Sequence, residues 1–255
     1  MDQASVRKAL RYNSIILLGI LAGACGQNVT EHKPVRVSTP APQFTPPPVE
    51  IKKPVNVSFS TYSKDWPVEW QWIDPDEAKD PTPHDVKGGV LRVTVETRKD
   101  LHGEYRNAPR YLKSIKGDFQ IETRVRFSPK ENYQGAGLLI FVNDNNYLRF
   151  ERAYAGGEGG GEGIRLDIRE GSDHRPIVTP GDIQWEAPEV DLKVMRIGRL
   201  FIAYWRANEE QEWREAGEYE SQYPDAVLAG VAVVNTARPV TAEFVYIKLL
   251  PGVGR

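Results

Sequence analysis

The chain has 255 residues, of which 40% are hydrophobic and 27% are charged. This ordinary globular composition excludes both a disulfide-held miniprotein and a wholly disordered chain. The 33 Lys and Arg residues nearly balance the 35 Asp and Glu residues, so the charge does not favour nucleic acid as a partner. The single cysteine, Cys25, excludes an internal disulfide and a cysteine-rich metal site.

Residues 1–24 have the features of an export signal. Arg7, Lys8 and Arg11 form a positive segment ahead of an apolar run at 15–24. Such a run spans about 15 Å as a helix, half of the roughly 30 Å hydrocarbon core, so it is too short to cross a membrane. The run ends in the tract LAGAC, which resembles the lipobox of bacterial lipoproteins.

The lipobox resemblance implies where the protein is located in the cell. It makes Cys25 the lipid attachment site and holds the mature chain on the outer side of a bacterial membrane, since several acyl chains give durable anchoring. Gly26 stands where an aspartate would retain a lipoprotein at the inner membrane, so the resemblance implies the outer membrane in a host that has one. The alternative is an ordinary cleaved signal peptide ahead of a buried cysteine.

Residues 25–54 are rich in proline and nearly free of large apolar side chains. Proline fixes φ and favours the extended polyproline II conformation. The segment is therefore predicted to be a semi-rigid, solvated tether. At about 3 Å per residue, it would hold the following domain up to about 80 Å from the membrane.

From residue 55 to residue 255, apolar and polar side chains alternate with period two, which is typical of strands with one buried face. The alternating segments are 91–96, 119–127, 147–151 and 164–169, with further strands expected at 57–62, 69–73, 190–197 and 241–250. Continuous apolar runs at 137–142, 201–205 and 227–234 predict strands covered on both faces. About a dozen short strands without a helical segment predict an all-β fold, an antiparallel two-sheet jelly-roll sandwich over residues 55–255.

Five tracts carry a resemblance to a known family. They are IKGDFQIET at 115–123, YQGAGLLI at 133–140, NNYLRF at 145–150, GRLFIAYW at 198–205 and GVAVVNT at 230–236. They resemble a bacterial family of unknown function in the concanavalin A-like lectin/glucanase superfamily. They are also similar to the accessory sandwich domain of some family-43 glycosidases. The resemblance covers residues 57–250 and implies a concanavalin A-like fold, to which the glycine-rich loop at 156–163 looks like an addition.

Catalytic motifs are missing from the sequence. Glucanases of this superfamily place Glu-x-Asp-x-Glu on one strand, so that three carboxylates share one face, and the chain lacks that spacing. It also lacks a Gly-x-Ser-x-Gly elbow and a phosphate loop. We therefore expect no catalytic residue and no cofactor.

The sequence also gives no metal-binding pattern. The histidines, predicted to lie in solvated loops, have no zinc-ligand spacing; they are His32, His84, His102 and His174. The acidic segment Asp74–Asp80 has oxygen ligands but not the spacing or central glycine of a calcium loop. It is interpreted as a solvated turn, with no bound metal expected.

Outward-facing polar residues are the candidate ligand site. Three rows are expected to lie side by side: Glu122 and Arg124 on one strand, Tyr147, Arg149 and Glu151 on a second, and Arg165 and Asp167 on a third. Arg forks and carboxylates hydrogen-bond sugar hydroxyls or an acidic glycan, and Tyr147 would form an apolar floor. Trp185 is predicted to be an exposed ring that stacks on sugar. The alternative is a set of cross-strand ion pairs on a solvated sheet.

The sequence thus predicts a membrane-tethered, non-catalytic binding module for a carbohydrate or cell-envelope glycan. Most of that functional expectation comes from the resemblance, and a fold alone does not fix a function. One alternative is a glycoside hydrolase whose carboxylates are not revealed by their spacing. The other is a structural or protein-binding component of the cell envelope.

Overall fold

The computed structural model describes residues 55–57, 70–156 and 160–252, which belong to one compact unit, Pro47–Arg255. The predicted export signal, the lipid attachment site Cys25 and the tether lie outside the described residues. All the regular secondary structure within the described ranges is β-strand. These ranges contain no helix that is long and apolar enough to cross a membrane.

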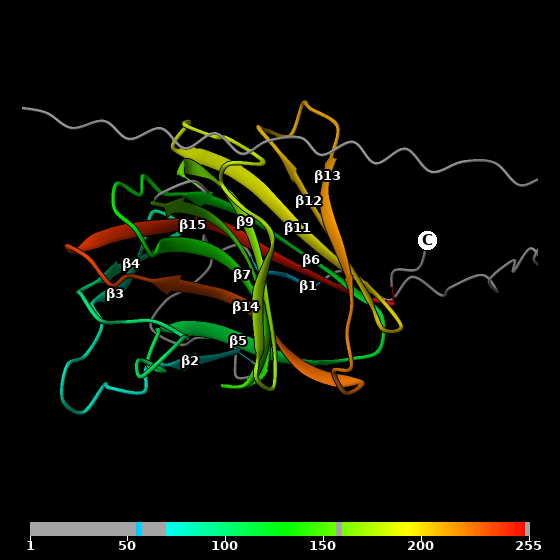
Figure 1. Ribbon diagram of the computed structural model, residues 1–255, viewed down its shortest axis with the longest axis horizontal. Coiled ribbons are helices and arrows are strands. Elements are labelled where there is room, and N and C mark those ends of the chain that lie inside the picture. The colour runs from blue at the N-terminus through cyan, green and yellow to red at the C-terminus, as the bar shows by residue number, and fades with distance from the viewer. Residues whose placement is uncertain (1–54, 58–69, 157–159, 253–255) are drawn as a thin grey trace, which may run out of the picture. The chain divides into compact units, whose positions relative to one another are not determined.

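The strands form two antiparallel sheets, which face each other as a sandwich (Figure 1). Sheet A has the order β13 (Arg214–Glu220), β12 (Leu200–Arg206), β11 (Glu189–Ile197), β6 (Phe119–Arg126), β15 (Val240–Pro251), β4 (Val90–Val95) and β3 (His84–Lys87), with β1 (Val55–Val57) also paired to β15. Sheet B has the order β10 (Asp173–Val178), β9 (Gly161–Glu170), β8 (Asn146–Ala155), β7 (Gln134–Asn143), β14 (Ala226–Val234), β5 (Arg110–Lys116) and β2 (Trp70–Ile73). The predicted all-β jelly-roll sandwich of concanavalin A-like type is confirmed.

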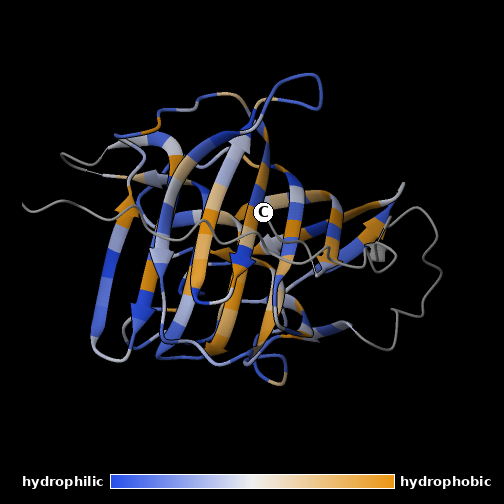
Figure 2. Cartoon of the chain, turned by 90° about the vertical axis from the view of Figure 1, so that its right-hand side faces the viewer, coloured by the Kyte–Doolittle hydropathy of each residue, from blue (hydrophilic) through white to orange (hydrophobic). Residues whose placement is uncertain are grey.

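The core lies between the two sheets and follows from the period-two pattern. On β6 the inward positions Ile121 and Val125 are fully buried, as are Leu138 and Ile140 on β7. Figure 2 shows the alternation as hydrophilic and hydrophobic bands along the strands. Burying one such side chain fully contributes about 1.5–3 kcal/mol, so the facing rows supply most of the drive to close the sandwich.

A tight turn joins β11 to β12. Strand β11 ends at Ile197 and β12 begins at Leu200, and Gly198 between them has φ of 59°. That left-handed conformation is accessible to glycine at little cost.

One connection leaves the edge of the sandwich and crosses the outer face of sheet B. The covering loop, residues 96–109, joins β4 to β5. Lys99 exchanges two backbone hydrogen bonds with Asn235, which follows β14. Leu101 and Ala108 of the loop pack in a second hydrophobic cluster with Leu139 and Tyr147 of sheet B. Part of this outer face is therefore shielded from solvent.

Candidate ligand-binding site on the outer face of sheet B

The expectation of one platform made of three adjacent rows is wrong. Strand β6 belongs to sheet A, where it pairs with β11 and β15, whereas β8 and β9 are neighbours in sheet B. Glu122 and Arg124 therefore lie on one outer face of the sandwich, and Arg149 and Asp167 lie on the opposite one. Period two identifies the buried side of a strand, but it does not say which sheet the strand joins.

The β6 row lies in a layer of ion pairs that satisfy one another. The Asp191 carboxylate, fully buried, accepts from Arg124 Nε at 2.7 Å and from Arg206 Nε at 2.9 Å. Arg126 Nε donates to Glu189 at 2.5 Å, and the hydrogen bond to Asp191 raises the pKa of the Arg124 guanidinium. On this face the cross-strand ion pairs considered as the alternative are present.

Aromatic rings on the outer face of sheet A make cation–π contacts with lysine and arginine side chains of the same face. Lys193 Nζ lies 4.3 Å from the ring of Trp213 and 4.6 Å from that of Tyr204. Arg206 lies 4.3 Å from the same Trp213 ring, and Lys248 lies 4.3 Å from Tyr246. Each such contact contributes about 0.5–1 kcal/mol at an exposed site. These rings are therefore already engaged within the protein.

On the outer face of sheet B, the two predicted rows lie side by side as expected. Arg149 of β8 pairs with Asp167 of β9, and Glu151 pairs with Arg165. The Asp167 carboxylate accepts from Arg149 Nη2 at 2.7 Å and lies 2.8 Å from Arg165 Nε. Arg149 Nη1 also donates to Asp100 of the covering loop at 3.2 Å. Unlike a solvated surface, this cluster is buried: Asp167, Glu151 and Arg149 are 0, 4 and 5% exposed.

The two carboxyl groups on β8 and β9 have opposite pKa shifts. Burial raises the pKa of Glu151 above its usual range, although Arg149 and Arg165 oppose the shift. Burial also acts on Asp167, but there the contacts with Arg149 and Arg165 prevail and lower its pKa. Opposed shifts of neighbouring carboxyls are common at functional sites, and they make Asp167 the permanent anion of the pair.

Two glycines of β7 make room for Glu151. A Cβ atom at Gly135 would lie 2.5 Å from the Glu151 carboxyl carbon, and one at Gly137 would lie 2.6 Å from Glu151 Cα. Real Cβ atoms do not approach other atoms so closely. Glycine at 135 therefore lets the buried carboxyl lie over β7, and glycine at 137 lets the backbone of β8 approach β7 closely.

Several buried polar atoms of this face have no hydrogen-bond partner. Across the described residues, the guanidinium Nε atoms in that condition belong to Arg110, Arg149 and Arg169, all on this face of sheet B. Asp167 Oδ1 and His174 Nε2 are also without a partner. Leaving a buried donor or acceptor unpaired costs about 1–3 kcal/mol, and native proteins contain few such groups. Their concentration here marks the face as a candidate binding site.

The histidines do not all lie in solvated loops as expected. His102 is exposed on the covering loop, but His174 lies on β10, and the two rings stack with centroids 4.1 Å apart. Burial, reinforced by the electrostatic effect of the neighbouring His102, lowers the pKa of His174 to about 4. His84 lies on β3 and stacks on Trp72 at 3.9 Å, while His32 lies outside the described residues.

The predicted exposure of two aromatic side chains, Tyr147 and Trp185, is wrong. Tyr147 is fully buried, and its hydroxyl donates to the Leu101 carbonyl of the covering loop at 3.3 Å, so it is not an open floor. Trp185 is half-buried against the core: its ring lies 5.3 Å from that of Trp205, and its Nε1 donates to the Glu189 carbonyl at 3.1 Å. Packing against neighbouring apolar groups explains both positions.

The acidic segment is also not simply a solvated turn. Lys99 of the covering loop, 2% exposed, places its Nζ 3.7 Å from Asp74, 3.5 Å from Asp76 and 3.5 Å from Asp80. The ammonium group lies where a cation bound by these carboxylates would lie. In the described ranges, no group of three or more His, Cys, Asp or Glu side chains is arranged to hold a metal ion.

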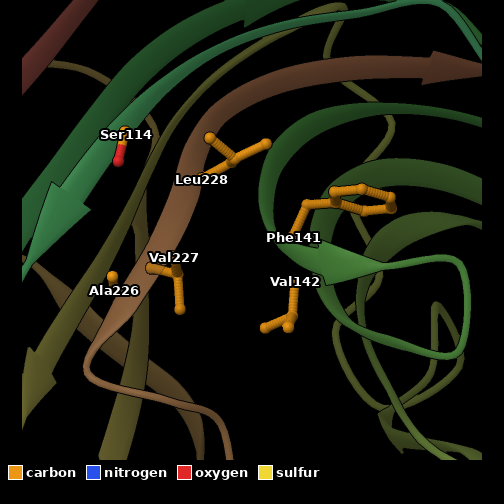
Figure 3. Close-up of a pocket in the computed structure, with 6 residues that line it drawn as sticks. All are labelled: Ser114, Phe141, Val142, Ala226, Val227 and Leu228. Atoms are coloured by element: carbon orange, nitrogen blue, oxygen red, sulfur yellow. The ribbon is translucent and has the colours of Figure 1, made fainter.

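A small pocket lies at the end of β5, β7 and β14 (Figure 3). Its volume is about 130 Å³, and Ser114 supplies its one polar side chain beside Phe141 and Leu228. Ligand pockets are about 300–1,000 Å³, so this pocket is too small to hold a sugar ring with its contacts.

Sequence reasoning missed Asp100, Arg110 and His174 as members of the cluster. Asp100 lies in the covering loop and Arg110 follows it directly, so the approach of both residues to β8 depends on where that loop lies. Arg110 begins a strand whose alternation is weak, and His174 lies on an edge strand that was not predicted. A pattern within one strand carries no signal for such contacts.

The fold and the buried cluster define a concanavalin A-like β-sandwich with a candidate polar site on one outer face. The chain belongs to the DUF1349 family, described as a protein of unknown function, whose profile matches residues 78–249. No curated relative matches the sequence.

Solved structures share the fold at low sequence identity. A functionally unknown protein from Saccharomyces cerevisiae has a TM-score of 0.60 and 15% identity over 73% of this chain and 98% of its own. The GH43 protein BlXynB of Bacillus licheniformis has a TM-score of 0.61 and 18% identity over 76% of this chain and 38% of its own. The CBM2 module of the evolved Dit of Lactobacillus casei BL23 phage J-1 has a TM-score of 0.53 and 11% identity over 78% of this chain and 96% of its own.

Proposed function

We propose that this protein is a carbohydrate-binding module that the lipid on Cys25 holds at the outer side of a bacterial membrane. The binding site is the outer face of sheet B around Arg149, Glu151 and Asp167. The observation that carries the proposal is the set of unpartnered buried atoms there, which includes both donors and an acceptor. Sugar hydroxyls donate and accept at once, so a sugar can satisfy both kinds of atom.

The comparisons support this function at the level of the fold. One structural neighbour is named as a carbohydrate-binding module, and another is a glycosidase-family protein of which this chain spans about two-fifths. We extend the binding of carbohydrate from those names to this chain as part of the proposal. Binding would use side chains that the sheet already holds in place, without a cofactor.

A glycoside hydrolase is the second candidate function. The raised pKa of Glu151 and the lowered pKa of Asp167 are the pattern of an acid and a base. Against it, two guanidiniums hold Asp167 Oδ2, and both carboxyls are buried. Release of reducing ends from any bound oligosaccharide would favour the hydrolase over the binding module.

A glycan array tests the binding proposal. Every described strand lies within the fragment 47–255, which therefore retains the whole described core and serves as the soluble probe. Binding should be lost in Arg149→Ala and kept in Arg124→Ala, a matched change on the outer face of sheet A. Equal loss in both variants, or binding that neither change affects, would remove the site from sheet B.

Membrane attachment is tested separately in cells that make the full chain. With Cys25→Ala, the protein should move from the membrane fraction to the soluble fraction, because the acylated thiol is the proposed anchor. A wild-type chain that is already soluble would contradict the anchor and leave the binding site untouched.

A further inference from the structure

We propose that the ligand of the sheet B site is an acidic sugar, one whose ring carries a carboxylate, as a uronic acid does. This inference rests on the proposed carbohydrate binding and names the class of sugar. It comes from an imbalance between guanidinium and carboxyl groups on this face, which a neutral sugar would not correct.

The imbalance begins with two arginines that lack an acidic partner. Arg110 Nη1 donates to the Ala108 carbonyl at 3.0 Å, and its guanidinium lies 4.6 Å from the Phe141 ring. Arg169 contacts His102 Nδ1 and Asn145 Oδ1, both at 3.3 Å. Among the described residues neither guanidinium has a carboxylate within ion-pair distance.

The carboxylates within the cluster are already in contact with Arg149 and Arg165. Arg149 and Arg165 share the Asp167 carboxylate, and Arg149 also meets Asp100. Glu151 lies 3.9 Å from Arg149 Nε, and Asp144 and Asp74 act on Arg110 only from beyond ion-pair distance. A buried cation needs an anion in contact, and among the described residues Arg110, 7% exposed, has none.

The unsatisfied atoms point to the same partner. Three guanidinium Nε donors stand against one carboxylate oxygen, Asp167 Oδ1, and one imidazole nitrogen, His174 Nε2. A carboxylate only accepts hydrogen bonds, and a charge-assisted bond to a guanidinium is about twice as strong as a neutral one. The ring hydroxyls of the same sugar can donate to the remaining oxygen.

The protein already places one carboxylate on this cluster from outside the sheet. Asp100 reaches Arg149 from the covering loop, and Leu101 beside it closes over Tyr147. The unpartnered Nε atoms are shielded from solvent. The sugar therefore reaches these guanidiniums when the covering loop lifts, which breaks the contact between Asp100 and Arg149.

Titration calorimetry on the 47–255 fragment tests the inference with matched probes. One probe is an oligogalacturonate, the second is the same oligomer after reduction of its carboxyls to hydroxymethyl groups, and the third is a sulfated neutral oligomer. The uronate should bind at least about tenfold more tightly than the reduced oligomer, which corresponds to about 1.4 kcal/mol. It should also bind more tightly than the sulfated one.

Variants locate the preference on this face. Arg110→Gln and Arg169→Gln should each remove most of the tenfold preference for the uronate, and Arg124→Gln on sheet A should keep it. Asp100→Asn should increase uronate affinity several-fold, because it weakens the contact with Arg149 that holds the covering loop on the sheet. Because Arg169 is half-buried, its variant tests the inference even where Arg110→Gln unfolds the chain.

Each contrary outcome has a distinct meaning. Equal affinity for the uronate and the reduced oligomer would overturn the acidic sugar and leave carbohydrate binding in place. Equal affinity for the sulfated oligomer would replace the carboxylate with a general anion and would also overturn the inference. If no oligosaccharide of any class on the glycan array binds, the proposed function itself fails.

Discussion

The two outer faces of the sandwich carry similar residues and differ in how those residues are satisfied. On sheet A, Arg124 and Arg206 meet around Asp191, and cations cover the rings of Trp213 and Tyr246. On sheet B, Arg149 and Arg165 meet around Asp167 in the same way. Yet the Nε atoms of Arg110, Arg149 and Arg169 on this face have no hydrogen-bond partner.

The number of charged residues on a face therefore does not identify a binding site. Ion pairs that reach solvent contribute little, and the outer face of sheet A is made largely of such pairs. Burial makes each unmet group costly. A protein keeps such groups where a partner arrives later, which is why we propose the site on sheet B.

Replacing the central aspartate of each face, Asp167 or Asp191, should give the largest difference in the free energy of unfolding between sheet B and sheet A. Asp167→Ala removes the carboxylate that Arg149 and Arg165 share and leaves Arg149, whose side chain is only 6% exposed, with Asp100 as its one hydrogen-bonded acid. The free energy of unfolding should therefore fall by about 3–5 kcal/mol. Asp191→Ala should cost about 1.5–3 kcal/mol, because Arg124 and Arg206 are both more exposed than Arg149, at 18% and 13%, and Arg124 keeps Glu189 nearby. Urea unfolding followed by tryptophan fluorescence measures both, and equal losses would contradict the contrast.

The pH dependence of the free energy of unfolding should reveal the effect of His174, the half-buried histidine of sheet B. His174 has a pKa of about 4 in the folded chain against 6.5 for an ordinary histidine, so the unfolded chain binds more protons between these values. Stability should therefore fall as the pH drops from about 6.5 to 4, by about 1–2 kcal/mol after allowance for partial exposure of the ring.

Urea unfolding at several pH values checks this sign. In His174→Gln the loss between pH 6.5 and 4 should shrink by that amount. An unchanged slope in the variant would show that the ring is not held neutral against the covering loop.

An exposed ion pair on sheet A should show the smallest effect. Arg126 pairs with Glu189, but 46% of the Arg126 side chain remains exposed. Arg126→Ala should change the free energy of unfolding by less than about 0.5 kcal/mol and leave glycan binding unaltered. A loss of more than about 1 kcal/mol would mean that this face is less solvated than its geometry indicates.

Much of the sandwich could be predicted from the sequence, because alternation is a local property. The strands around Ile121, Leu148 and Ile168 follow the period-two pattern closely. Strands β3, β5, β10 and β13 were not predicted: β13, for example, has the sequence REAGEYE, with little apolar contrast. The expected strand at 57–62 falls largely outside the described residues, where β1 ends at Val57.

The candidate site was predicted in part. Alternation placed Arg149 and Glu151 on one face of their strand, and Arg165 and Asp167 on one face of theirs. That these strands are neighbours follows from the short connection between them. The sequence could not separate β6 from them or bring Asp100 to Arg149, because strand order and loop placement depend on contacts between distant residues.

Ligand-induced NMR shifts in the ¹⁵N-labelled 47–255 fragment show which outer face binds the sugar. On titration with oligogalacturonate, the largest amide shifts should fall on β8, β9 and residues 96–109, and strands β11, β12 and β13 should stay unchanged. Shifts concentrated on β11, β12 and β13 would contradict the account, because they would place the ligand on the face whose charges already have partners.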